Sequence, residues 1–124
     1  MASSLISANR AFFTIVTKSH LAYARAMAGQ LRKFHPGVPL MVFLADNPDN
    51  YFDPAAEAFP TVKLQDYLPG GELDTMPEYY TAFELCNALK PFAHLYLAAK
   101  TNLENWIYLD SDVYVCGAFD RIFS

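Results

Sequence analysis

The fold class follows from residues 11–44, which read AFFTIVTKSHLAYARAMAGQLRKFHPGVPLMVFL. Residues 11–16 are a β-branched and aromatic run that ends in polar residues, as a buried strand does at a sheet edge. Apolar residues then recur at helical spacing from Leu21 to Phe34, and Pro36-Gly37 ends the predicted helix. A second apolar run, residues 40–44, leads to Asp46. A strand, a helix and a strand form a βαβ unit with parallel strands, so we expect an α/β fold with a mostly parallel sheet and flanking helices.

The boundaries of further elements follow from capping and breaking residues. Ser19 is the expected N-cap of the first helix, because its hydroxyl can accept a backbone hydrogen bond. Residues 61–64 are the expected third strand. The capping box Thr81-x-x-Glu84 predicts a helix that meets a kink or a restart at Pro91 before residues 92–97 continue it. Residues 106–109, WIYL, predict the last strand.

Composition limits the class of protein. The chain has 124 residues, 53% of them hydrophobic and 18% charged, against roughly 45–50% and 25% in an average domain. This indicates one domain rich in core residues. The net charge is −4, and no basic run is longer than Arg32-Lys33, which disfavours binding to nucleic acid.

The same sequence carries few signs of export or of cysteine chemistry. No run of about 18 apolar residues and no apolar signal region predicts a transmembrane or secreted chain. We therefore expect a soluble, cytoplasmic protein without a transmembrane segment. Cys86 and Cys116 lack metal-ligand spacing, so two reduced, mostly buried thiols are expected.

Two carboxylates follow the last predicted strand in the sequence Asp110-Ser111-Asp112. Residues i and i+2 of an extended chain point to the same side, so both carboxylates converge just beyond the strand's carboxyl end. In an open α/β sheet, ligands bind at that edge. Hard oxygen donors suit Mg²⁺ or Mn²⁺, which commonly keep water and substrate phosphates in their shell. We therefore expect a metal-bound diphosphate as the ligand. The alternative interpretation of this motif is an acidic turn after a strand, without a bound metal.

Missing motifs narrow the possible ligands. No G-x-G-x-x-G follows the first strand and no P-loop occurs, so dinucleotide oxidoreductases and P-loop enzymes are disfavoured. With only five glycines, the phosphate contacts must come from a metal and a cationic side chain. Lys90 is the candidate cation, although it could equally be a solvent-facing lysine at a helix end. The three histidines are expected to lie at the surface or to pack against neighbours: His20, His35 and His94.

Three sequence blocks, in this order and at this spacing, carry a resemblance to a known family. They are residues 14–27 (TIVTKSHLAYARAM), 84–92 (ELCNALKPF) and 107–113 (IYLDSDV). Together they resemble the first half of a GT-A glycosyltransferase and are similar to the glycogenin and lipopolysaccharide galactosyltransferase family. The resemblance implies the Rossmann-like, nucleotide-sugar-binding half of such a domain.

The resemblance also implies ligands and residue roles. The donor is expected to be a nucleotide-sugar, usually a UDP-sugar, with an unknown acceptor, and the metal is usually Mn²⁺. Asp110 and Asp112 correspond to the metal ligands. The other implied donor contacts are Val16 and Thr17 at the base or ribose, Tyr23 near the base, Ser111 near the ribose, and Lys90 as the basic residue beside the donor.

Residues 1–124 are accordingly expected to be the N-terminal, donor-binding part of a single glycosyltransferase domain that ends soon after its D-x-D motif. The surplus of apolar residues then suggests self-association through an incomplete sheet. Two alternatives remain open. Asp110 could be the nucleophile of a haloacid-dehalogenase-type phosphatase with Asp112 as its acid–base, or the chain could be a non-catalytic, donor-binding half-domain.

Overall fold

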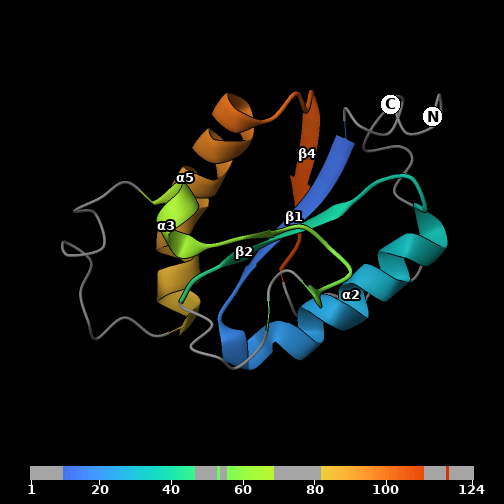
Figure 1. The fold of residues 1–124 in the computed structure, drawn as a ribbon, viewed down its shortest axis with the longest axis horizontal. Coiled ribbons are helices and arrows are strands. Elements are labelled where there is room, and N and C mark those ends of the chain that lie inside the picture. Colours follow the sequence, from blue (N-terminus) through green and yellow to red (C-terminus); the bar gives the residue numbers. More distant parts are fainter. Residues whose placement is uncertain (1–9, 47–52, 54–55, 69–81, 111–116, 118–124) are drawn as a thin grey trace.

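The structure is a computed structural model that describes residues 10–46, 53, 56–68, 82–110 and 117. The elements in chain order are β1 (Arg10–Val16), η1 (Lys18–His20), α2 (Leu21–Phe34), β2 (Leu40–Leu44), β3 (Thr61–Val62), α3 (Leu64–Tyr67), α5 (Ala82–Lys100) and β4 (Asn105–Tyr108). The element η1 is a short 3-10 turn. The described strands form a four-stranded parallel sheet in the order β3-β2-β1-β4 (Figure 1). The expected α/β fold with a parallel sheet is confirmed.

The strand register brings the carboxyl ends of β1, β2 and β4 to one edge of the sheet. On β1, Val16 lies beside Leu44 at the end of β2, and Phe13 lies beside Tyr108 at the end of β4. The backbone N–H of Leu109 also donates to the Phe13 carbonyl at 2.9 Å, which extends this pairing beyond β4. Residues that follow β1, β2 and β4 therefore emerge at the same edge.

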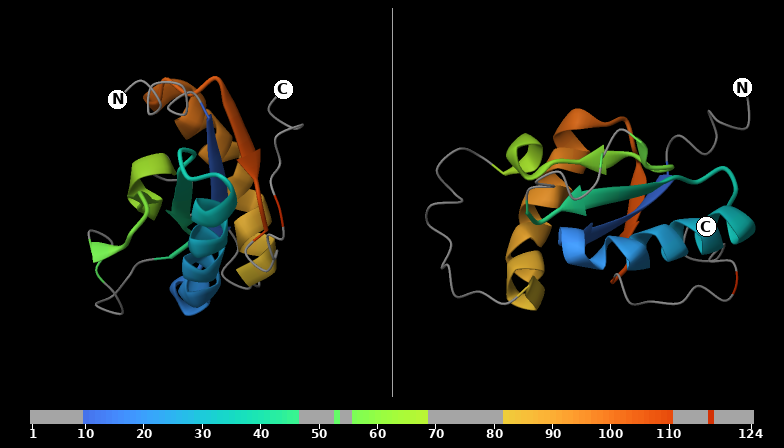
Figure 2. Two further views of the ribbon diagram at one scale, coloured as in Figure 1. Left: turned by 90° about the vertical axis from the view of Figure 1, so that its right-hand side faces the viewer. Right: turned by 60° about the horizontal axis from the view of Figure 1, so that its bottom comes forward.

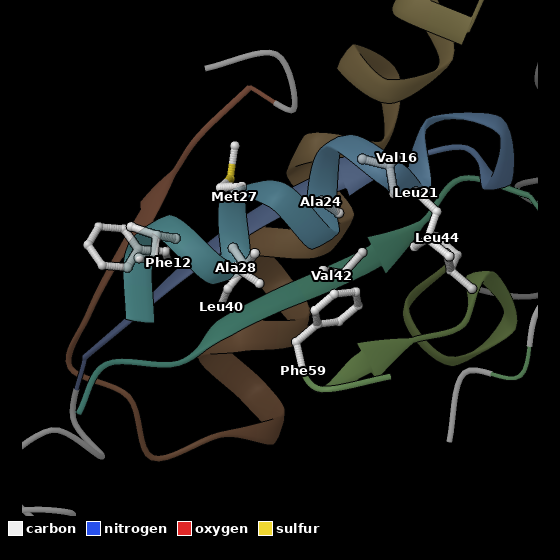
Figure 3. Packing of buried hydrophobic residues seen from close by; sticks show 11 residues of the cluster. Phe12, Val16, Leu21, Ala24, Met27, Ala28, Leu40, Val42, Leu44 and Phe59 are labelled. Atoms are coloured by element: carbon white, nitrogen blue, oxygen red, sulfur yellow. The ribbon is translucent and has the colours of Figure 1, made fainter. Parts of the chain in front are cut away.

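Helix α2 covers one face of the sheet. Its apolar residues recur every three or four positions, so they share one side of the helix. They pack on alternate residues of the strands, because successive side chains of a strand point to opposite faces. The buried residues of this layer are Phe12, Val16, Leu21, Ala24, Met27, Ala28, Leu31, Leu40, Val42, Leu44 and Phe59 (Figure 3).

Helices α3 and α5 cover the opposite face (Figure 2). Leu89, Ala93 and Leu97 recur every four positions along α5 and are all 0% exposed. They share a buried cluster with Phe13 and Phe43, which are strand residues on the face of the sheet opposite α2. The sheet thus lies between two helical layers.

Two sequence expectations about these elements are wrong, and a third is narrowed. The N-cap of α2 is His20 rather than Ser19, which lies within η1, and the cap makes no side-chain hydrogen bond. The third strand ends at Val62, because Leu64 begins α3 and packs with it into the core. At Pro91, where a kink or a restart is expected, helix α5 continues without a restart. The ring of Pro91 is exposed, so the carbonyl that loses its helical partner there can be hydrated.

In the described part of the chain, no helix combines the length and the apolar character that a membrane crossing needs.

Candidate functional site

The strand order reverses between β1 and β4. From β1 the chain proceeds outward to β2 and β3 on one side, and it later returns to place β4 on the other side of β1. The connection that leaves β1 therefore crosses to β2 on one side, whereas the chain after β3 crosses to β4 on the other. In open α/β sheets, a crevice at such a reversal is the usual place for a ligand.

A group of polar side chains follows β1 at this point. The Thr17 Oγ1 atom lies 2.9 Å from Ser19 Oγ and 3.1 Å from His20 Nδ1, and Ser19 Oγ lies 3.1 Å from the same ring nitrogen. The His20 ring stacks on the Tyr23 ring with 5.6 Å between centroids. Tyr23 is 52% exposed. The loop after β1 thus presents hydroxyl groups, an imidazole and an accessible aromatic ring.

Asp46 joins this loop to the loop that follows β2. Its Oδ1 atom accepts a hydrogen bond from the backbone N–H of Lys18 at 2.9 Å. A backbone hydrogen bond of 2.8 Å from Ala45 to the Val16 carbonyl lies beside it. Two hydrogen bonds therefore connect the loop after β1 with the residues that follow β2, at the edge of the sheet.

Lys90 and Asp110 approach the same edge from α5 and from the end of β4. Lys90 is half-buried, and its Nζ atom lies 4.3 Å from the centroid of the Tyr108 ring. A cation over an aromatic face is attracted by the ring's quadrupole. Asp110 lies two residues after Tyr108 and is exposed. The site combines a held ammonium group with an accessible carboxylate.

The thiol of Cys86 lies within electrostatic range of these charges. Its pKa is raised to about 11, chiefly by burial and then by the Asp46 carboxylate, with the Lys90 ammonium opposing and the Asp110 carboxylate adding to the increase. Burial also raises the pKa of the Tyr67 hydroxyl, with smaller contributions from Cys86 and Asp46. That hydroxyl donates to the Leu44 carbonyl at 2.6 Å. Asp46, Lys90 and Asp110 thus all act electrostatically on the Cys86 thiol, on the side of the edge next to α5.

The structure places several of the predicted site residues at this edge. Val16 is buried at the end of β1, Thr17 and Lys90 are half-buried, and Asp110 and Tyr23 are exposed. Ser111 and Asp112 lie outside the described residues. Within the described ranges, no three histidine, cysteine or acidic side chains are close enough to form a complete metal site.

The histidines behave as the sequence predicts. His20 and His94 are exposed. The Trp106 indole N–H donates to His94 Nδ1 at 3.0 Å, and the His94 ring meets Phe13 edge-on. His35 is buried against the ring of Phe12. Of these, only His20 lies beside the candidate site.

Sequence reasoning missed two residues of this site. Asp46 lies two residues beyond the end of β2, and its place after a buried strand was an available signal. Cys86 precedes Lys90 by one helical turn, so both residues lie on one side of α5. The expectation that the thiols are reduced agrees with Cys86, which is free and half-buried, whereas Cys116 lies outside the described residues.

No known protein family, curated protein or solved structure matches this chain.

Proposed function

We propose that the chain is the donor-binding part of a GT-A glycosyltransferase, which transfers a sugar from a UDP-sugar to an acceptor. The observation that carries the proposal is the position of Asp110. It is an exposed carboxylate two residues beyond the end of β4, where the strand order reverses. Asp110 and Lys90 both act electrostatically on the Cys86 thiol. A carboxylate that can hold a divalent cation and a nearby positive side chain suit a nucleoside diphosphate at such a place.

The two halves of this edge suit the two ends of a nucleotide. The loop after β1 offers the Thr17 hydroxyl and the exposed Tyr23 ring, which suit a ribose and a base. The β4 and α5 side offers charge, which suits a diphosphate. The proposal thus assigns the nucleoside to the end of β1 and the phosphates to the end of β4.

Asp110 has the chemistry of a ligand for Mn²⁺ or Mg²⁺, and the sequence supplies a second carboxylate two positions later in Asp112. When bound, the ion would neutralise the charge that develops on the departing nucleoside diphosphate. Lys90 would add positive charge at the phosphates, and its contact with Tyr108 fixes its ammonium group before the ligand arrives. These residues hold charge and orient the donor.

Titration calorimetry with a UDP-sugar and MnCl₂ tests the proposal. Wild type is expected to bind, while Asp110→Asn and Asp112→Ala are expected to bind at least tenfold more weakly, because each loses a charged metal ligand. Glu104→Gln is the matched control, since Glu104 is an exposed carboxylate just before β4, at the opposite end of the same strand. Equal binding by wild type and both aspartate variants would overturn the assignment.

An aryl-phosphate assay separates the phosphatase alternative. Turnover by wild type that disappears in Asp110→Asn would favour a phosphoryl-transfer nucleophile at this position. We expect no turnover, because the proposal gives Asp110 a metal-binding role.

A further inference from the structure

Asp46 makes a contact that links two segments far apart in the sequence. It follows β2, and its Oδ1 atom accepts the Lys18 backbone N–H at 2.9 Å across 28 positions of the chain. The carboxylate is half-buried. Hydrogen bonds from a backbone N–H to an ionised acceptor are stronger than neutral ones.

This contact satisfies the first N–H group of η1. Thr17 is the N-cap residue of η1, yet its side chain makes no capping hydrogen bond. Asp46 binds the N–H of Lys18, the first residue of that turn. The Thr17 hydroxyl instead lies within hydrogen-bond distance of Ser19 and His20. The remote carboxylate thus holds the first residue of the turn, next to the Thr17 hydroxyl.

The position of η1 in turn sets the start of α2. His20 is both the last residue of η1 and the N-cap of α2, and its ring stacks on Tyr23 in the first turn of that helix. The backbone bond from Ala45 to Val16 fixes the base of the same connection. A shift of Lys18 would thus move the hydroxyl group and the aromatic ring together.

We infer that Asp46 is a positioning residue for the nucleoside end of the site: its carboxylate fixes η1 and thereby holds Thr17 and Tyr23 in place for the ligand. The inference rests on the proposed function for its ligand and on the hydrogen bond to Lys18 for its mechanism. Asp46 acts through the backbone of the loop and does not itself contact the nucleotide.

Hydrogen exchange on the unliganded chain tests the mechanism. Asp46→Ala is expected to speed amide exchange in residues 18–23 about tenfold, because it removes a charge-assisted hydrogen bond. Asp46→Asn keeps an oxygen that can accept from Lys18 and is expected to restore most of the protection. Asp66→Ala removes an exposed carboxylate from α3 and is the control for net charge. Exchange in Asp46→Ala equal to wild type would overturn the inference.

Binding of UDP with MnCl₂ tests the consequence. We expect Asp46→Ala to bind about tenfold more weakly than wild type, with recovery in Asp46→Asn and no change in Asp66→Ala. Affinity in Asp46→Ala equal to wild type, with faster exchange, would overturn the nucleotide role of Asp46. If wild type binds no UDP, the proposed function fails together with that role, and the exchange rates alone decide whether Asp46 fixes the turn.

Discussion

At the scale of single residues, Thr14 places a hydroxyl inside an apolar layer. It lies between Phe12 and Val16 on β1 and is 0% exposed, and among the described residues its Oγ1 atom has no hydrogen-bond partner. A buried polar group without a partner costs roughly 1–3 kcal/mol. Thr14→Val keeps the branched shape and removes the hydroxyl, so we expect the free energy of unfolding to rise by about 1 kcal/mol.

Urea denaturation measures this change. Thr14→Ser is the control, because it keeps the hydroxyl and loses a methyl group, and it is expected to lower the free energy of unfolding by about 1 kcal/mol. A valine variant less stable than wild type would mean that the hydroxyl is satisfied in solution.

The reactivity of the Cys86 thiol is a second residue-scale property, and it depends on the charged groups of the site. The thiol pKa of about 11 lies about two units above the ordinary value of 9.0, so near neutral pH its thiolate fraction is about a hundredfold lower. Because only the thiolate is nucleophilic, alkylation by iodoacetamide is expected to be correspondingly slow and to rise with pH up to about 11.

Substitution of the neighbouring charges should move this profile in opposite directions. Asp110→Asn removes a carboxylate that raises the pKa of Cys86 and is expected to speed alkylation, whereas Lys90→Met removes the opposing ammonium and is expected to slow it. Mass spectrometry of the Cys86 peptide gives the rates. If both variants react like wild type across the pH range, the three groups are not neighbours.

At the scale of elements, an ion pair fastens the segment before β3 to α2. The Arg25 guanidinium donates to both carboxylate oxygens of Glu57, with Nε 2.9 Å and Nη2 2.8 Å from them. This contact lowers the pKa of Glu57 below its ordinary value of 4.5. Since the Arg25 side chain is 52% exposed, we expect Glu57→Gln to cost only about 0.5–1 kcal/mol at pH 7.

The pH dependence of this cost has a defined sign. A carboxyl with a lowered pKa in the folded state stabilises the protein above its unfolded pKa and loses that effect as the pH falls through the folded value. Unfolding curves of wild type and Glu57→Gln should therefore differ at pH 7 and converge well below pH 4.5. A difference that persists in strong acid would point to packing rather than to the ion pair.

Helix α5 offers a matched pair of leucines. Leu97 is 0% exposed in the layer against the sheet, while Leu95 is 65% exposed on the same helix. Leu97→Ala is expected to lower the free energy of unfolding by about 2–5 kcal/mol through the cavity it leaves. Leu95→Ala should change it by less than about 0.5 kcal/mol. Similar losses in both variants would mean that the face with Leu95 is also buried.

At the scale of the whole molecule, hydrophobic pattern was enough to predict the sheet and its main helices. Residues 40–44 were predicted as a strand and form β2. A short, continuous apolar run bounded by turn residues is typical of a buried strand. Chemistry local to a turn was harder to predict. Ser19 matched an N-cap by type, but its hydroxyl lies with Thr17 and His20 instead.

The candidate site was predictable only where topology implied it. Asp110 follows the strand run of residues 106–109, so its place at the carboxyl edge followed from the parallel sheet. The contact of Asp46 with Lys18 depends on the side-by-side placement of β1 and β2 and on the shape of η1. Residues 28 positions apart gave no periodic signal for it.

We propose that a nucleotide and its metal ion bind at the carboxyl edge of the sheet, between the ends of β1 and β4. The most direct test is the broadening of backbone amide NMR signals by paramagnetic Mn²⁺ in the presence of UDP. We expect UDP-dependent broadening that is strongest in residues 18–23, 86–90 and 109–110 and weakest at the opposite edge, in residues 38–40 and 102–105. Broadening that is independent of UDP, or strongest at the opposite edge, would contradict it.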